Sequence, residues 1–265
     1  MNGVETINKK NYSVFYITTF SDGLKAAIRN RLSSICHGAA DAATGRHLYS
    51  YKNTLVEFLK RYNTKTDDQK KGMIGELLTH VILSELVNDY TVVSPFFNTE
   101  ERNVKKGFDI ILCKNGTDEL WLTEVKSGEL HNGKDVSQTA VDLINTAQAD
   151  MNNKLNGDSV SLWLNAVNGA KAAIDEAGTD RDAIISILQD CGDDAVQDNL
   201  CSKDFNVMLV GTVFKSLDDR IDEAKIASKH SRVVKKNYFN CAYLIAIQKG
   251  TYQSVVSFLE SESAI

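Results

Sequence analysis

The sequence predicts an α/β fold with a mixed central sheet flanked by helices, and three observations support this prediction. Segments with apolar residues at helical spacing alternate with short segments rich in β-branched and aromatic residues. From residue 68 onward these segments follow the order helix, three strands, helix, strand, helix, strand, which is typical of layered α/β proteins. The chain has 265 residues, 43% of them hydrophobic, and can bury a core without disulfide or metal support.

The N-terminal part, residues 1–67, is expected to add a strand and helices to that core. Aromatic and β-branched residues concentrate over 12–19, which predicts a strand. Helices are expected over 22–36 and 49–62. No linker follows this part, so we expect one domain over 1–265.

The helix expected over 68–88 is apolar on nearly all sides, which is typical of a buried helix. A short strand is expected over 90–94, just before the only proline of the chain. Strands expected over 108–113 and 120–126 are joined by residues with turn chemistry, which predicts a hairpin. A helix over 135–155 follows this hairpin.

The rest of the chain is expected to complete the core after an interruption. A strand is expected over 205–214, a helix over 218–229 and a strand over 241–248. The intervening stretch, 156–203, has the pattern of a mainly helical insertion. The expected parts of the single domain are therefore the N-terminal addition 1–67, a core over 68–155, the insertion 156–203 and a C-terminal part of the core over 204–265.

Charge and composition argue against several classes of protein. The formal net charge of −5 is unlike that of an indiscriminate nucleic-acid coat protein, although a local basic patch can still bind DNA. No apolar run reaches the roughly eighteen residues of a membrane span, and the polar N-terminus lacks a secretory signal. The five cysteines are scattered and have no zinc-site spacing. A soluble, cytoplasmic protein with reduced thiols is expected.

Two charged residues stand on one face of the strand predicted over 120–126. Because side chains alternate along a strand, Glu124 and Lys126 point the same way, while Val125 points to the opposite side. Burying both charges costs several kcal/mol unless they are paired or bind a metal ion. This placement predicts a functional site, although a Glu-x-Lys sequence also occurs on ordinary solvated strands.

Asp109 stands at the beginning of the preceding strand, where an aspartate is disfavoured. In a hairpin it can approach Glu124, and two carboxylates so close repel each other unless a proton or cation lies between them. Oxygen ligands indicate Mg²⁺ or Mn²⁺. Glu76, on the helix predicted to be buried, also needs a partner, and the adjacent Gly75 permits close approach of a neighbouring backbone.

The set of Glu76, Asp109, Glu124 and Lys126 resembles the active site of the PD-(D/E)XK nuclease superfamily. This resemblance covers about 68–155 and implies a restriction-endonuclease-like core, here with N-terminal and internal helical additions. Phe108 stands where the motif has proline. More narrowly, the chain resembles the nuclease subunit of Hachiman anti-phage defence systems in size, in the segments 71–78 and 107–109, and in Trp121-Leu122-Thr123-Glu124-Val125-Lys126-Ser127. That family implies DNA as substrate and a superfamily 2 helicase as partner.

The resemblance assigns a role to each residue. Asp109, Glu124 and the Val125 carbonyl would hold one Mg²⁺ or Mn²⁺, and Glu76 would bind a second ion or orient its water. Lys126 would position the attacking water and stabilise charge on the phosphate. Gln138 resembles a glutamine that some relatives place near the site. Lys105 and Lys106 precede Asp109 and are candidate phosphate contacts, although such charge runs also occur as solvated faces.

Two alternatives remain open at the level of sequence. One is a non-enzymatic adaptor that keeps a nuclease fold only to bind a helicase or nucleic acid. The other is a stand-alone homodimeric restriction endonuclease, but no target-recognition domain is recognisable. The retained acidic residues and lysine favour an active enzyme over the adaptor. Since no Gly-x-x-x-x-Gly-Lys-Ser/Thr motif occurs, the chain itself is not expected to hydrolyse ATP.

Overall fold

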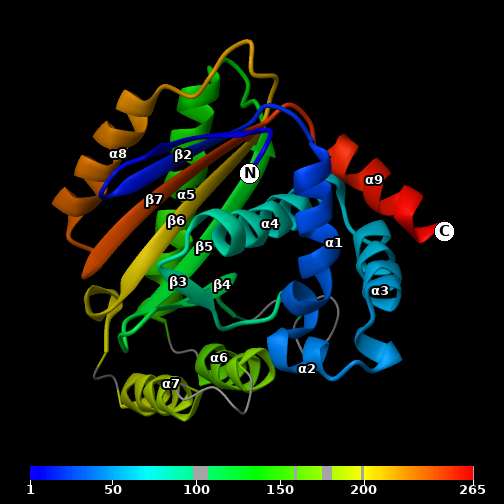
Figure 1. Ribbon diagram of the computed structural model, residues 1–265. Coiled ribbons are helices and arrows are strands. Elements are labelled where there is room, and N and C mark those ends of the chain that lie inside the picture. Colours follow the sequence, from blue (N-terminus) through cyan, green and yellow to red (C-terminus); the bar gives the residue numbers. More distant parts are fainter. Residues whose placement is uncertain (98–106, 158–159, 175–180, 198–199, 265) are drawn as a thin grey trace.

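The computed structural model describes residues 1–97, 107–157, 160–174, 181–197 and 200–264 (Figure 1). In this part of the chain seven strands form one mixed sheet in the order β1-β2-β7-β6-β5-β4-β3. The strands are β1 Val4–Asn8, β2 Tyr12–Ile17, β3 Tyr90–Val92, β4 Ile110–Lys114, β5 Leu120–Glu129, β6 Asn206–Phe214 and β7 Cys241–Lys249. The four central strands β2, β7, β6 and β5 run parallel, and the outer pairings are antiparallel. The predicted mixed central sheet is confirmed.

Helices cover both faces of this sheet, as Figure 1 shows. On one face α4 lies across the strands, with α1, α3 and α9 beside it, and on the other lie α5 and α8. The helices are α1 Asp22–His37, α2 Ala39–Ala43, α3 Tyr51–Asn63, α4 Asp67–Leu86, α5 Val136–Leu155, α6 Val160–Ala173, α7 Arg181–Val196, α8 Glu223–Lys236 and α9 Gln253–Ser263. The predicted order of core elements, from α4 to β7, is confirmed.

The sheet separates two hydrophobic cores. In the central strand β6, Val207 and Leu209 point into the core shared with α5, whereas Met208 and Val210 point into the core shared with α4. Both faces of β6 are therefore buried, which explains its nearly continuous apolar sequence. A strand with one solvated face would alternate apolar and polar residues instead.

Helix α4 is the buried helix that the sequence predicts. It begins at a capping box formed by Thr66 and Gln69. Gly75 brings it so close to β5 that a Cβ atom at this position would lie 1.8 Å from Oγ of Ser127. Helix α4 thus packs directly on the strand that is predicted to carry the site.

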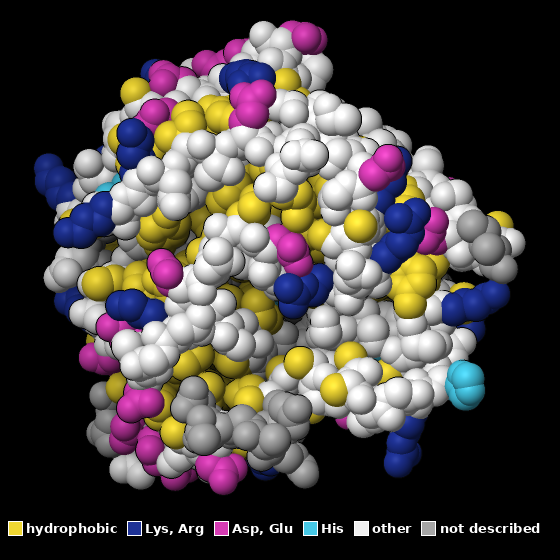
Figure 2. All heavy atoms as spheres, in the orientation of Figure 1, with side chains coloured by type: hydrophobic (Ala, Val, Ile, Leu, Met, Phe, Trp, Pro, Cys, Tyr) yellow, Lys and Arg dark blue, Asp and Glu magenta, His cyan; other side chains and the backbone are white. Residues whose placement is uncertain are grey.

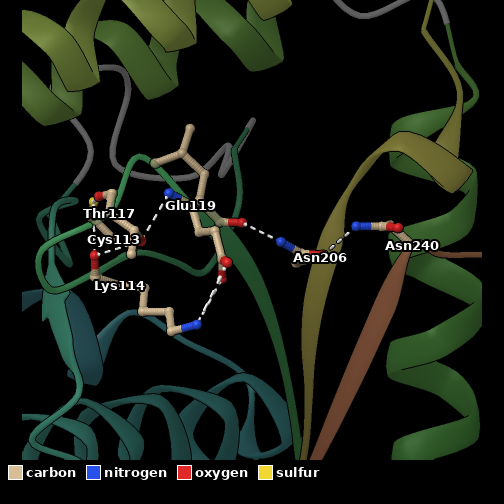
Figure 3. A network of polar contacts seen from close by, with 7 residues as sticks. Cys113, Lys114, Thr117, Glu119, Asn206 and Asn240 are labelled. Carbon is tan, nitrogen blue, oxygen red and sulfur yellow. Dashed lines mark hydrogen bonds and ion pairs between the residues drawn. The ribbon is translucent and has the colours of Figure 1, made fainter.

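Strands β4 and β5 form the predicted antiparallel hairpin. At its turn Lys114 pairs with the Glu119 carboxylate at 3.2 Å, and Oγ1 of Thr117 donates to the Lys114 carbonyl at 3.0 Å (Figure 3). Asn206, at the beginning of β6, donates to a β5 carbonyl at 3.5 Å and accepts from Asn240 at 2.8 Å. These contacts connect the turn to the first residues of β6 and to the loop before β7.

Helix α8 begins later than the helix predicted over 218–229. Asp222 is its N-cap, because its side chain accepts a hydrogen bond from the Ala224 amide at 2.9 Å. The Gln248 side chain accepts from the Ile221 amide at 2.9 Å and so holds the preceding residues outside the helix. The correction therefore comes from a long-range contact with β7.

The stretch 156–203, predicted as a helical insertion, contains α6 and α7 in its described part. Trp163 of α6 packs against Phe108 and Phe205, with ring centroids 5.4 and 5.3 Å apart.

No helix in the described part of the chain combines the length and apolar character that a membrane crossing requires.

Candidate active site

Asp109 lies where β4 and β5 cease to pair through their backbones. The last paired residue of β4 towards the site is Ile110, opposite Thr123, and Asp109 immediately precedes it. Its Oδ2 accepts a hydrogen bond from the Val125 amide at 2.7 Å. The side chain of Asp109 thus binds a β5 amide beyond the last backbone pair and lies beside Glu124.

Glu124 points from β5 towards α5, and its side chain is 2% exposed. Its Oε1 accepts from Nζ of Lys126 at 2.9 Å, and its Oε2 accepts from Nζ of Lys154 at 2.6 Å. Each oxygen of this buried carboxylate therefore binds an ammonium group. The predicted facing of Glu124 and Lys126 is confirmed, and the cost of burying Glu124 is offset by pairing.

Helix α5 supplies two charged residues to this cluster, Asp150 and Lys154. Asp150 accepts from Lys126 at 2.6 Å, so Lys126 lies between two carboxylates. Lys154 also donates to the carbonyl of Gly107 at 3.1 Å. We call Asp109, Glu124, Lys126, Asp150 and Lys154 the acid–lysine cluster.

The electrostatics of the cluster reflect burial and close charges. Burial raises the pKa of Glu124, and the nearby Asp109 raises it further, against the opposing effects of Lys154 and Lys126. Burial acts to lower the pKa of Lys126, but Glu124, Asp150 and Asp109 outweigh it and raise that pKa above its usual value. Lys126 is therefore an ammonium ion at neutral pH, which suits a group that contacts a phosphate.

Sequence reasoning does not find Asp150 and Lys154. Their spacing could have indicated them, because residues four apart lie on one face of a helix. The buried residues Met151 and Leu155 lie next to this face. A charged pair at the border of an apolar helix face indicates a polar partner on the sheet. The sequence alone does not identify which strand residue that partner is.

Glu76 belongs to α4, not to the β4–β5 hairpin or to α5. It is half-buried on α4, and α4 packs on the face of the sheet opposite α5. Its neighbour Gly75 lies against Ser127, the residue after Lys126, so this turn of α4 packs on β5. Burial raises the pKa of the Cys36 thiol in α1, and the charge of Glu76 adds to this effect. The role of Glu76 as a ligand for a second ion stays a prediction.

Of the three candidate DNA contacts, the structure describes only Gln138. Lys105 and Lys106 lie outside the described residues. Gln138 is exposed in the first turn of α5, where it forms a capping box with Asp135. Sixteen residues separate it from Lys154, roughly 24 Å along the helix axis. The structure therefore does not bring Gln138 to the acid–lysine cluster.

The oxygen atoms near Asp109 suit a hard divalent cation. Two carboxylates, Asp109 and Glu124, together with the Val125 carbonyl form a donor set of the kind that Mg²⁺ and Mn²⁺ bind. Among the residues that the structure describes, no group of three or more His, Cys, Asp or Glu side chains is arranged to hold a metal ion. A metal site here would therefore rest on two carboxylates and a backbone oxygen.

A cavity of about 690 Å³ is lined by strand residues of the sheet face that α4 covers and by Val233 and Val234 of α8. Its lining includes Trp121, Met208 and Tyr243 from three adjacent strands, and apolar side chains gather on this face of the molecule (Figure 2). Among the described residues, its lining includes neither Asp109 nor Glu124. The chemistry of the cluster is thus separate from this cavity.

Comparison with models of protein families matches residues 2–260 to HamA. The chain belongs to the HamA family. HamA is a component of the Hachiman anti-phage defence system, whose other protein is a helicase. This match covers nearly the whole chain and confirms the predicted resemblance at the level of the family. No curated protein matches the sequence of this HamA family member.

Proposed function

We propose that this HamA family member is a metal-dependent DNA nuclease with a PD-(D/E)XK active site, and that it acts with the helicase of its system. The observation that supports the proposal most is the convergence of Asp109, Glu124 and Lys126. Asp109 binds the amide between the other two residues at 2.7 Å, and Lys126 binds Glu124 at 2.9 Å. Residues at the end of the β4–β5 hairpin thus form one charged cluster.

The fold is consistent with this proposal. In the proposed restriction-endonuclease-like core, α4 corresponds to the first helix, β3 to β5 to the three strands and α5 to the second helix. The acid–lysine cluster lies beside the C-terminal end of α5, because Asp150 and Lys154 of this helix pair with Lys126 and Glu124. A pure adaptor would gain no stability from burying Glu124.

In the proposed mechanism Asp109, Glu124 and the Val125 carbonyl would hold Mg²⁺ or Mn²⁺. When bound, such an ion lowers the pKa of water and stabilises negative charge on the phosphate. Lys126 remains charged, because carboxylates flank it, and it orients the scissile phosphate and the attacking water. Asp150, whose side chain is 42% exposed, pairs with the ammonium group of Lys126 and so holds it on the solvent side of the site.

A cleavage assay tests this function. The chain and its helicase are incubated together with plasmid and linear DNA in Mg²⁺, Mn²⁺ or EDTA. We expect cleavage with either metal ion, none in EDTA, and a loss of about 100-fold or more in Glu124→Gln and in Lys126→Met, because each removes charge from the proposed site.

The matched control is Lys134→Met, which breaks the exposed Lys134–Asp142 ion pair near the other end of α5. It is expected to cleave like the wild type. Thermal melting curves of every variant identify loss of folding. Unchanged cleavage by both Glu124→Gln and Lys126→Met would overturn the site. Helicase binding without metal-dependent cleavage would favour the adaptor instead.

A further inference from the structure

Lys154 occupies a position that the proposed chemistry does not require. It belongs to the last turn of α5, and its Nζ lies 2.6 Å from Oε2 of Glu124 and 3.1 Å from the Gly107 carbonyl. It therefore connects β5 with the segment just before Asp109. These are the two segments whose oxygen atoms form the proposed donor set.

The carboxylate of Glu124 binds two ammonium groups, but it needs only one to offset its charge. Lys126 binds Oε1 and also pairs with Asp150. Within the part of the chain that the structure describes, Lys154 pairs with the Glu124 carboxylate alone, through Oε2. A divalent cation bound by Glu124 needs an oxygen with a free lone pair facing Asp109. Lys154 presents a positive charge at Oε2 of Glu124, beside the Gly107 carbonyl in the segment that leads to Asp109, and repels a cation that approaches this oxygen.

Counting formal charges leads to the same result. Three carboxylates and two ammonium groups give the acid–lysine cluster a charge of −1. Adding a divalent cation beside both ammonium groups would give +1 in a partly buried site. Withdrawing one ammonium group at the same time would give a neutral cluster, which is favoured around the buried Glu124 carboxylate.

We propose that Lys154 competes with the divalent cation for Glu124, so that the cation binds only when the Lys154 side chain leaves Oε2. The side chain can leave, because it is 29% exposed and stands at the end of a helix, with four rotatable bonds. Lys126, held on two sides, stays in place. This inference rests on the proposed function, and it makes Lys154 a regulator of cation binding rather than a catalytic residue.

Equilibrium binding of Mn²⁺ to the full chain tests this inference without any measurement of cleavage. Calorimetric titrations compare the wild type with Lys154→Met, Lys154→Arg and the control Lys134→Met. Removing the competing charge is expected to tighten Mn²⁺ binding by roughly tenfold or more in Lys154→Met, since a unit charge a few ångströms away is worth more than 1.4 kcal/mol even in a polar site. Lys154→Arg and Lys134→Met are expected to bind like the wild type.

Thermal melting adds a second readout. In EDTA, Lys154→Met is expected to melt below the wild type, because Glu124 loses one of its two partners, and Mn²⁺ is expected to raise its melting temperature by more than that of the wild type. Lys154→Gln, which keeps a donor without the charge, replaces Lys154→Met if the latter does not fold.

The possible failures are distinguishable. If wild type and Lys154→Met bind Mn²⁺ equally, or if the variant binds more weakly, competition by Lys154 is wrong while the metal site stands. If neither the wild type nor any Lys154 variant binds Mn²⁺, the proposed metal chemistry fails, and the inference fails with it.

Discussion

Lys229 shows how strongly one buried charge can depend on its surroundings. It is 2% exposed, and its Nζ donates to Oε1 of Gln148 on α5 at 2.6 Å. Burial, together with the positive charges of the nearby Lys236 and Arg232, lowers its pKa to about 8. The sequence places Lys229 in a basic run typical of a solvated helix face, and the structure buries it between α8 and α5.

This lowered pKa predicts a pH dependence of stability. Between about pH 8 and the usual lysine pKa, the unfolded chain holds a proton on Lys229 that the folded chain has lost. Stability therefore rises with pH in this window, by at most about 1.4 kcal/mol per pH unit from this residue. Urea unfolding of wild type and Lys229→Met between pH 7 and 10 measures it.

Lys229→Met is expected to reduce this rise, and the difference between the two proteins isolates the residue from other groups that titrate. The matched control is Lys225→Met on the same helix, where the lysine is exposed. Parallel pH profiles of wild type and Lys229→Met would contradict the assignment.

At the scale of elements, the contact between α4 and β5 depends on one glycine. A Cβ atom at Gly75 would lie 1.8 Å from Oγ and 2.5 Å from Cβ of Ser127. We expect Gly75→Ala to destabilise the protein by about 1–3 kcal/mol, because the helix must move away from the strand. Chemical denaturation measures this change in the free energy of unfolding.

Two further variants make the test specific. Ser127→Gly removes the opposing side chain and should recover part of the loss in the double variant. Gly72→Ala lies on the same helix, with nothing within 4 Å of its added Cβ, and should be neutral or stabilising by up to about 1 kcal/mol. Equal destabilisation by both alanine variants would show that helix propensity, not contact with Ser127, decides the outcome.

The elements with the clearest periodicity are those that the sequence predicts well. Helix α4, the β4–β5 hairpin and α5 lie within two or three residues of their predicted ranges. The sequence does not predict β1, because only two of its five residues are even half-buried and its apolar alternation is weak. It pairs along its length with β2, so a partner strand decides its conformation.

Part of the candidate site can likewise be predicted from the sequence. Asp109, Glu124 and Lys126 belong to one hairpin, whose register follows from alternation and turn chemistry, so their convergence is predictable. Asp150 and Lys154 reach the same place from α5, and that depends on how the helix packs across the sheet. Short-range patterns do not determine this packing.

At the scale of the whole molecule, the stretch predicted as an insertion shares the main core. Trp163 of α6 is 5% exposed and lies between Phe108, next to Asp109, and Phe205, just before β6. Helix α6 thus supports the segment that leads into the candidate site, and its removal would expose core residues of the sheet.

We therefore expect Trp163→Ala to cost about 3–5 kcal/mol of stability. The neighbouring Leu164 is 58% exposed, so Leu164→Ala is a matched control that should change stability by less than about 1 kcal/mol. Urea unfolding followed by circular dichroism measures both. Similar small effects of the two variants would mean that α6 is peripheral to the fold.

The strand order has a consequence for how the polypeptide folds during its synthesis. Tyr12 of β2 pairs with Leu244 of β7, so the second strand waits for a neighbour synthesised 232 residues later. The hairpin and helix around Glu124, in contrast, come from one short stretch of chain whose contacts close small loops. During translation the acidic and basic groups can therefore assemble well before the N-terminal strands join the sheet. The sheet is complete only after β7 has emerged from the ribosome.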